Sequence, residues 1–391
     1  MGNKHASKTK YSRRRIGKVN TPLNKKLENV EWGEKIYLKE LFSIKRGKRL
    51  TVEYRVKGER PLVTAGFEKT GVAEYIGNEN QETFPEDTIT IDMFGNTFYR
   101  NYKYSADDNI LVLFNKKEMP SKAKIFIVNL INRQLHNKFS YGKQFRIGGF
   151  EQTKIQLPIK NGKIDFDFME SFIAELEAER IKKLEDYLVA NGFNNYVLTD
   201  EEKQVLEAFR NDKNSMGGVV DNQVVVNLKW RKFNLEKLFG KATRGKRLKG
   251  DDRILGDLPF VTAGETDEGV SAFIGNNVNI FPENTTTIDM FGSAKYRNYK
   301  YGGDDHVAVV HTENLPKLAS IFVTTSIHKT SYNGQFNYGR NFYAKDADEL
   351  NISLPAVNNQ PNYELMEILI SAIQKLVLKD VVLYVNNKIN G

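Results

Sequence analysis

A long internal repeat constrains this sequence more than any other feature. The tract Arg-Gly-Lys-Arg-Leu at 46–50 returns at 244–248, so the two glycines are 245 − 47 = 198 residues apart. Thr-Ile-Asp-Met-Phe-Gly occurs at 90–95 and again at 287–292, in nearly the same register. Because self-similarity at a long offset marks a duplicated folding unit, the sequence predicts two copies of one module.

Each copy consists of a globular part followed by a long helix. The 391 residues suit two domains of ordinary size. The predicted segments are a basic arm (1–31), a first domain (32–164), a first long helix (165–192), a linker with a short helix (193–229), a second domain (230–360) and a second long helix (361–391).

Two patterns of apolar residues indicate an α+β fold. Short runs rich in β-branched and aromatic residues, separated by Gly and Asn, predict strands of a mixed or antiparallel sheet. Later in each copy the spacing becomes helical. In the first helix Asp167 and Glu170 form a capping-box pattern and Asn191-Gly192 ends the run, while Asn362 is the expected cap of the second helix.

The apolar stripes of these two helices are wide for helices that lie alone in water. We expect the helices to pair as an antiparallel coiled coil with pseudo-twofold symmetry. The alternative is that each helix folds back onto its own sheet.

Several functional classes are excluded or disfavoured. Without cysteine there are no disulfides and no cysteine-ligated metals, and the five histidines show no metal-ligand spacing. No apolar run approaches the roughly 20 residues of a membrane span, and the basic N-terminus has no apolar core of a secretion signal. There is no phosphate-binding or dinucleotide-binding glycine motif and no Asn-Pro-Pro-Tyr motif. We expect a cytoplasmic chain that does not contact membranes, binds no metal or cofactor of its own and has no catalytic residues.

The net charge of +9 is unevenly distributed. Residues 1–30 carry 9 basic side chains and 1 acidic one, and residues 32–164 carry 23 and 15, whereas residues 230–391 carry 19 and 18. Affinity for nucleic acid is therefore an inference from particular groups and not from the overall charge.

Recurring carboxylates are the candidates for catalysis. Asp92 and Asp289 occupy the same repeated motif, and Asp-Asp pairs recur at 107–108 and 304–305. Such groups can bind Mg²⁺ for phosphodiester cleavage, or they can cap turns. No lysine or histidine recurs beside them at a suitable spacing, so a nuclease is the less favoured reading.

Basic and aromatic groups also recur in both copies. Lysine and arginine neutralise phosphates and tyrosine adds a flat surface with a hydroxyl, a mixture that suits DNA. The alternative is a solvated strand edge with half-buried tyrosines. These candidate DNA contacts are Lys48, Arg49, Arg100, Tyr102, Lys246, Arg247, Arg297 and Tyr299.

Each copy contains a tryptophan, Gly-Lys-Arg, Val-Thr-Ala-Gly and Thr-Ile-Asp-Met-Phe-Gly, and it ends in a long helix. This repeated pattern resembles the specificity subunit of type I restriction-modification systems. The resemblance implies two target-recognition domains on one bipartite double-stranded DNA site, with the helices as spacer. It also implies two methyltransferase subunits that carry S-adenosylmethionine. The partner is either a methyltransferase with a separate restriction endonuclease subunit or a polypeptide that combines both activities.

Residues identical in the two copies can only do what both domains do, so base discrimination belongs where they differ. The most divergent loops are 67–81 against 265–278 and 116–143 against 312–340, which predicts an asymmetric target. The candidate base readers are Arg133, Gln134, Lys138, Lys143, His328, Lys329, Gln335 and Arg340. The nearly neutral second half leaves open a duplicated module that binds polysaccharide or protein.

Overall fold

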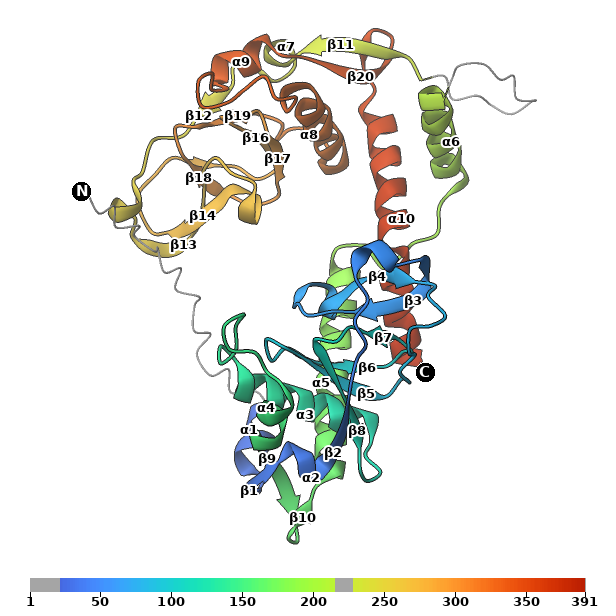
Figure 1. Ribbon diagram of the computed structural model, residues 1–391. Coiled ribbons are helices and arrows are strands. Elements are labelled where there is room, and N and C mark those ends of the chain that lie inside the picture. The colour runs from blue at the N-terminus through green and yellow to red at the C-terminus, as the bar shows by residue number, and fades with distance from the viewer. Residues whose placement is uncertain (1–21, 215–227, 391) are drawn as a thin grey trace. The chain divides into compact units, whose positions relative to one another are not determined.

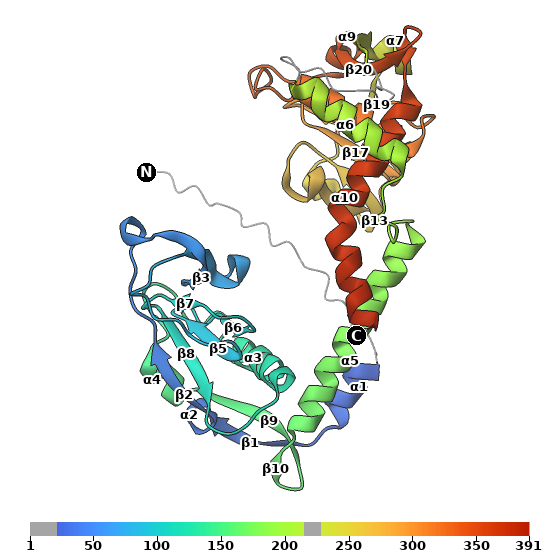
Figure 2. The same cartoon turned by 90° about the vertical axis from the view of Figure 1, so that its right-hand side faces the viewer.

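The computed structural model describes residues 22–214 and 228–390 and divides the chain into two compact units. The first ends at Lys183 and the second begins at Leu184, inside helix α5 (Phe166–Ala190) (Figures 1 and 2). Most of the predicted basic arm and the part of the linker at 215–227 lie outside the described residues.

In its described residues the first unit has a short helix, three small sheets, three further α-helices, two 3-10 helices and then α5. Its elements are α1(Pro22–Asn29), β1(Trp32–Tyr37), α2(Leu38–Leu41), β2(Phe42–Arg46), η1(Val52–Tyr54), β3(Lys57–Val63), η2(Glu68–Gly71), β4(Val72–Ile76), β5(Thr88–Asp92), β6(Thr97–Arg100), β7(Ser105–Ala106), β8(Ile110–Asn115), α3(Ser121–Leu135), α4(Ile147–Gln152), β9(Lys154–Lys160) and β10(Lys163–Ile164). The strand orders are β1-β9-β10, β2-β8-β5-β6 and β4-β3-β7.

The second unit repeats this topology. After α6(Asp200–Asn214) its elements are β11(Trp230–Asn234), α7(Leu235–Phe239), β12(Thr243–Arg244), η3(Gly250–Asp252), β13(Leu255–Val261), η4(Thr266–Gly269), β14(Val270–Ile274), β15(Ile280–Phe281), β16(Thr285–Asp289), β17(Ala294–Arg297), β18(Tyr301–Gly303), β19(Val307–Val310), α8(Lys317–Ser331), α9(Ala344–Glu349), β20(Asn351–Val357), β21(Gln360–Pro361) and α10(Tyr363–Asn390). The orders β11-β20-β21, β12-β19-β16-β17 and β14-β13-β18-β15 match those of the first unit, with β15 added.

The sheets are antiparallel except for one pair in each unit. The parallel pairs are β3 with β7 and β13 with β18. The mixed α+β fold and the duplication predicted from the sequence are confirmed.

The four-stranded sheet and a following helix form the core of each unit. Strand β5 is buried along its whole length, and α3 packs beside it through residues such as Ile127. The repeated tryptophan belongs to this core: Trp32 stacks on Phe126 of α3 with ring centroids 6.4 Å apart, and Trp230 stacks on Phe322 of α8 at 6.3 Å. Both Trp residues recur because both cores use them.

The two long helices begin at side-chain caps. Asn362 Oδ1 accepts a hydrogen bond from the Leu365 amide at 3.1 Å, so the cap predicted for α10 is confirmed. The cap of α5 is Asp165, whose Oδ1 accepts from the Phe168 amide at 2.9 Å, and not the predicted box at Asp167. The carboxylate that caps the helix stands just before its first residue, because its oxygen accepts from an unpaired amide of the first turn, which follows it in the chain.

The first turns of each long helix belong to the core of its own module. Met169 and Phe172 of α5 are buried in the first unit, and Met366 and Leu369 of α10 are buried in the second. For these turns the helix packs on its own module, as the alternative interpretation predicts. Pairing of the later turns as a coiled coil stays a prediction.

A short helix precedes each module and packs on the long helix that follows it. On α1, Leu23 is buried and Lys26 forms an ion pair with Glu175 of α5. On α6, Thr199 and Glu202 form a capping box, with hydrogen bonds of 3.2 and 2.8 Å. Within the part of the chain that the structure describes, no helix has the length and apolar character to span a membrane.

Candidate nucleic-acid interface

Asp92, in the repeated Thr-Ile-Asp-Met-Phe-Gly tract, holds two loops together. Its Oδ1 accepts from the amides of Phe94 and Asn96 at 2.8 and 2.9 Å, and its Oδ2 accepts from the Gly66 amide at 2.9 Å and the Asn96 side chain at 2.8 Å. The carboxylate is 2% exposed. Four donors occupy the lone pairs of both oxygens, so Asp92 positions loops.

Asp289 has the same function in the second module. It accepts from the amides of Phe291, Ser293 and Gly264 at 2.9, 3.0 and 3.2 Å, and it is 5% exposed. A metal ion would have to displace these hydrogen bonds to reach either aspartate. The nuclease alternative built on Asp92 and Asp289 is therefore disfavoured.

The Arg-Gly-Lys-Arg-Leu tracts pass directly against a neighbouring loop. A Cβ on Gly47 would lie 2.3 Å from the Asp107 carbonyl oxygen, and one on Gly245 would lie 1.6 Å from that of Gly303, so only glycine fits. Asp107 accepts from the Leu50 amide at 3.0 Å and fixes the end of the first tract. The cationic pairs between these anchors, Lys48 with Arg49 and Lys246 with Arg247, are exposed in both modules.

The predicted DNA contacts Arg100 and Arg297 are wrong. Each is 1% exposed. Arg100 donates to the carbonyl oxygen of Thr70 at 2.7 Å and to Thr90 Oγ1 at 3.0 Å, and Arg297 donates to the carbonyl oxygen of Glu268 and to Thr287 Oγ1, both at 2.9 Å. Both guanidinium groups are used inside the fold, which is why they recur.

The tyrosines of the same tracts contact these arginines and are half-buried. The hydroxyls of Tyr102 and Tyr299 accept from Arg100 and Arg297 at 2.9 and 3.0 Å, so each ring has a structural partner, and its contact with DNA stays a prediction. Tyr104 is fully buried, and this burial raises the pKa of its hydroxyl to about 12.

Arg100 and Arg297 each hold a turn with an unusual backbone. Lys69 and Thr70 have φ of 47° and 54°, and Asp267 and Glu268 have φ of 49° and 54°. A β-branched residue such as threonine rarely adopts this left-handed conformation, which costs on the order of 1–2 kcal/mol per residue. Strained turns of this kind concentrate at functional sites. These turns open the first pair of divergent loops.

Tyr141 and Tyr338 are exposed aromatic residues that the sequence reasoning missed. They are 79% and 85% exposed. Each lies in a two-residue turn that is closed by backbone hydrogen bonds, between Ser140 and Lys143 in the first module and between Asn337 and Arg340 in the second. Each ring meets a phenylalanine of the Met-Phe-Gly turn edge-on, at 5.1 Å from Phe94 and 5.2 Å from Phe291. The available signal was the Tyr-Gly pair retained in both copies before a basic residue.

The predicted base readers lie in several different environments. Lys143 and Arg340 occupy equivalent places beside the exposed tyrosines, so they are a shared feature of the modules. Arg133 lies on α3 and lines a groove with Trp32 and Phe172. The other exposed candidates are Lys138, Lys329 and Gln335, and Gln134 is half-buried.

His328 has a structural hydrogen bond. Its Nδ1 accepts from the Ala294 amide at 3.1 Å, as Asn132 Oδ1 accepts from the Thr97 amide at 2.8 Å in the first module. Only the opposite ring nitrogen of His328 is therefore left for a ligand.

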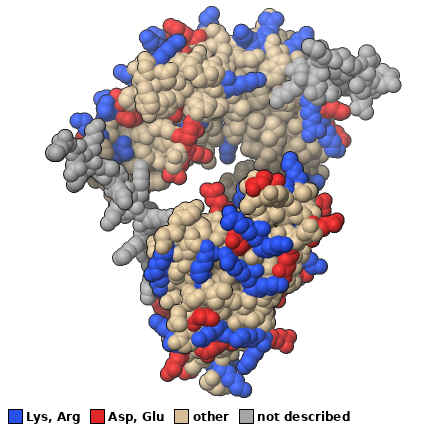
Figure 3. Space-filling model, viewed as in Figure 1, with Lys and Arg blue, Asp and Glu red and all other residues tan. Residues whose placement is uncertain are grey.

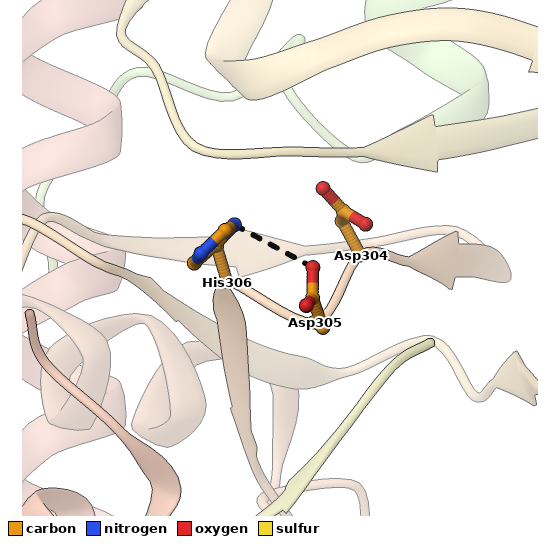
Figure 4. Close-up of side chains that lie close together, drawn as sticks. All are labelled: Asp304, Asp305 and His306. Carbon is orange, nitrogen blue, oxygen red and sulfur yellow. Dashed lines mark ion pairs between the residues drawn. The ribbon is translucent and has the colours of Figure 1, made fainter. Parts of the chain in front are cut away.

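Asp304, Asp305 and His306 lie close together on one turn, with His306 Nδ1 3.5 Å from Asp305 (Figure 4). Burial raises the pKa of Asp304, and the backbone of Leu248 partly opposes this rise. Asn109 takes the place of the histidine in the first module. Asp304 occupies the sequence position that corresponds to Asp107 in the first module.

Lys and Arg side chains are spread over the visible face of the first unit, with acidic groups between them (Figure 3). This matches the modest excess of 23 basic over 15 acidic residues in 32–164. Attraction to a polyanion must then come from particular exposed groups, such as Lys48 and Arg49.

Comparisons with known proteins agree with this architecture. The model of the type I restriction modification DNA specificity domain matches residues 29–186 and 227–381. The specificity subunit S.BcgI of a type II restriction enzyme from Heyndrickxia coagulans is 22% identical over 339 residues, covering 84% of this chain and 91% of that protein. The crystal structure of a type I restriction-modification S subunit from M. genitalium matches with a TM-score of 0.60 at 14% identity, over 93% of each chain.

The family match falls once on each module and covers more than half of the chain. The structural match independently shows the same fold. The chain belongs to the type I restriction modification DNA specificity domain family, and it is a non-catalytic DNA-specificity subunit of a restriction-modification system.

Proposed function

We propose that this chain directs methyltransferase subunits to a bipartite, asymmetric DNA site, with one half-site read by each module. The observation that carries the proposal is the division between shared and differing surface groups. The two modules share their topology and their exposed basic and aromatic positions, while the exposed loops attached to this scaffold differ.

The shared exposed groups contact the DNA backbone. Lys48 with Arg49, and Lys246 with Arg247, neutralise phosphates at equivalent places in the two half-sites. Tyr141 and Tyr338 place a ring and a hydroxyl beside Lys143 and Arg340. Contacts of this kind fix the position of a protein on DNA without reading sequence, which is why both modules can use the same residues.

The long helices set the distance between the half-sites. In this proposal the later turns of α5 and α10 pair in antiparallel orientation. Large apolar side chains in these turns are exposed, among them Tyr187 on α5 and Val377 and Tyr384 on α10, and packing would cover part of this surface. The unread gap between the half-sites then follows from the geometry of the helix pair.

The partners supply the chemistry. Two methyltransferase subunits, one for each half-site, carry S-adenosylmethionine. Restriction is performed by a separate endonuclease subunit or by a partner that combines both activities.

Long-read methylome sequencing of a host with and without this gene tests the proposal. We expect an asymmetric bipartite motif whose methylation disappears when the gene is deleted. Replacement of residues 230–360 by the equivalent domain of a related subunit should change one half of the motif and leave the other half intact. A palindromic motif, or a motif that persists without the gene, would refute the proposal.

A further inference from the structure

The two left-handed turns at 67–70 and 265–268 have nearly identical backbones but different side chains. In the first, φ is 47°, 54° and 82° at Lys69, Thr70 and Gly71. In the second it is 49°, 54° and 80° at Asp267, Glu268 and Gly269. The sequences are Phe-Glu-Lys-Thr and Glu-Thr-Asp-Glu, so every position differs.

Groups outside the four residues hold this backbone. The Gly66 and Gly264 amides donate to Asp92 and Asp289 at 2.9 and 3.2 Å. The buried guanidinium groups described above bond the carbonyl oxygens of Thr70 and Glu268.

The glycine that closes each turn is equally constrained. A Cβ on Gly71 or Gly269 would lie 2.8 or 2.7 Å from a backbone oxygen. Apart from the Thr70 hydroxyl, which accepts from Arg100 at 3.3 Å, the groups that fix the backbone of the turn lie outside its four side chains.

All four side chains of each turn are exposed, and Phe67 is 74% exposed. On the neighbouring strand, the residue that contacts the first residue of the turn also differs between the two modules. Phe67 packs on Phe98 with ring centroids 5.9 Å apart, whereas Glu265 forms an ion pair with Lys295, the counterpart of Phe98, at 3.1 Å. One apolar pair in the first module is thus replaced by one charged pair in the second.

The charge of the second turn indicates what it can meet on DNA. Glu265, Asp267 and Glu268 give it three carboxylates, and the Ser293 hydroxyl, with Lys295, holds the pKa of Glu265 below its usual 4.5. Carboxylates are repelled by phosphates, but they accept hydrogen bonds from base amino groups in the major groove. An exposed phenylalanine instead suits the methyl group of thymine.

We infer that these two turns are interchangeable base-reading elements of the two modules. The turn at 265–268 reads an exocyclic amino group, and the turn at 67–70 reads a thymine methyl group. This inference rests on the proposed function, because it requires that each module reads a half-site. The proposed function assigns base reading to the divergent loops as a whole. The inference assigns it, within these loops, to one turn of four residues in each module, whose backbone is fixed.

A reciprocal exchange of turns tests the inference in the assembled complex. The first variant carries Phe67→Glu, Glu68→Thr, Lys69→Asp and Thr70→Glu, together with Phe98→Lys to keep the supporting pair. The second carries the reverse changes at 265–268 with Lys295→Phe. Methylome sequencing should show one or two altered positions in the first half-site for the first variant, and in the second half-site for the second variant.

Single substitutions decide the matter if an exchanged chain fails to assemble. Phe67→Ala and Glu265→Ala leave the backbone anchors in place, and each should relax one position of its own half-site, lowering discrimination there roughly 5- to 150-fold. Lys163→Ala, an exposed change on β10, is the matched control and should leave the motif unchanged. Assembled variants that methylate only the wild-type motif would overturn the inference. Failure of the wild-type chain to determine any motif would instead overturn the proposed function.

Discussion

Arg100, a buried cation, donates a hydrogen bond of 2.7 Å to the carbonyl oxygen of Thr70, a β-branched residue in the left-handed region. Its guanidinium also lies over the ring of Phe98, with Cζ 5.2 Å from the ring centroid. Carbonyl, hydroxyl and aromatic groups surround the charge in place of water. The strained turn and the buried cation therefore depend on each other.

Arg100→Lys should destabilise the first module by about 2 kcal/mol, because a lysine ammonium cannot reproduce the guanidinium fork and leaves buried acceptors unpaired. Urea denaturation measures the change. Arg297→Lys should have the same effect in the second module. Lys103→Ala, an exposed change in the same tract, is the control and should alter stability by less than about 0.5 kcal/mol. An Arg100→Lys chain of wild-type stability that no longer bound DNA would restore Arg100 as a DNA contact.

Removal of the shared cations should weaken DNA binding without affecting the fold. Lys48→Ala with Arg49→Ala, and likewise Lys246→Ala with Arg247→Ala, should reduce the magnitude of the slope of log K against log salt by about 0.9 for each phosphate that is no longer neutralised. Fluorescence anisotropy at several salt concentrations gives this slope.

Two controls make the salt experiment interpretable. Lys163→Ala should leave the slope unchanged. The basic N-terminal segment should be deleted only through residue 21, because Leu23 is buried in the first module. If the chain without this segment showed no salt-dependent retention on duplex DNA, the polysaccharide or protein alternative would be favoured.

The duplication, the strand and helix pattern and the cap at Asn362 could be predicted because they depend on local sequence. The predicted cap of α5 is Asp167 and not Asp165, because the sequence does not show which of these two aspartates meets an unpaired amide. The role of Arg100 could not be predicted in this way. Whether an arginine in a Tyr-Arg-Asn tract faces solvent depends on Thr70, which is distant in sequence and unusual in backbone conformation. Tyr141 shows the opposite error, since its exposure follows from a turn that only the folded loop reveals.

Glu202 should make the stability of the second unit depend on pH. Burial alone would raise the pKa of its carboxyl, but hydrogen bonds from Lys375 at 2.8 Å and Ser371 at 2.7 Å outweigh this effect and hold the pKa below the usual 4.5. A carboxyl with a lowered folded-state pKa stabilises the fold above its unfolded-state pKa. This stabilisation is lost as the pH falls from 4.5 through the folded-state value.

Glu202→Gln should therefore lower the stability at pH 7, by about 2–4 kcal/mol, and remove the part of the acid dependence that Glu202 contributes. Thermal melts between pH 7 and pH 3 measure both effects. Asp200→Asn removes an exposed ion pair with Lys203 on the same helix and should leave the neutral-pH stability unchanged. An acid dependence that is identical in the Glu202→Gln chain would show that another group causes it.

Pairing of the long helices can be tested by a shorter truncation than the sequence alone suggests. Removal of residues 361–391 would delete Met366 and Leu369 from the core of the second module and would unfold that module whether or not the helices pair. A chain that ends at Lys379 keeps those residues and lacks Val382 and Val385, which are 2% and 1% exposed. If α10 pairs with α5, this chain should show a lower unfolding midpoint for the first module. Hydrogen exchange of the α5 amides measures this change. Removal of residues 387–391 alone is the control. An unchanged first module in the chain that ends at Lys379 would mean that α5 does not depend on α10, and the gap between the half-sites would then need another spacer.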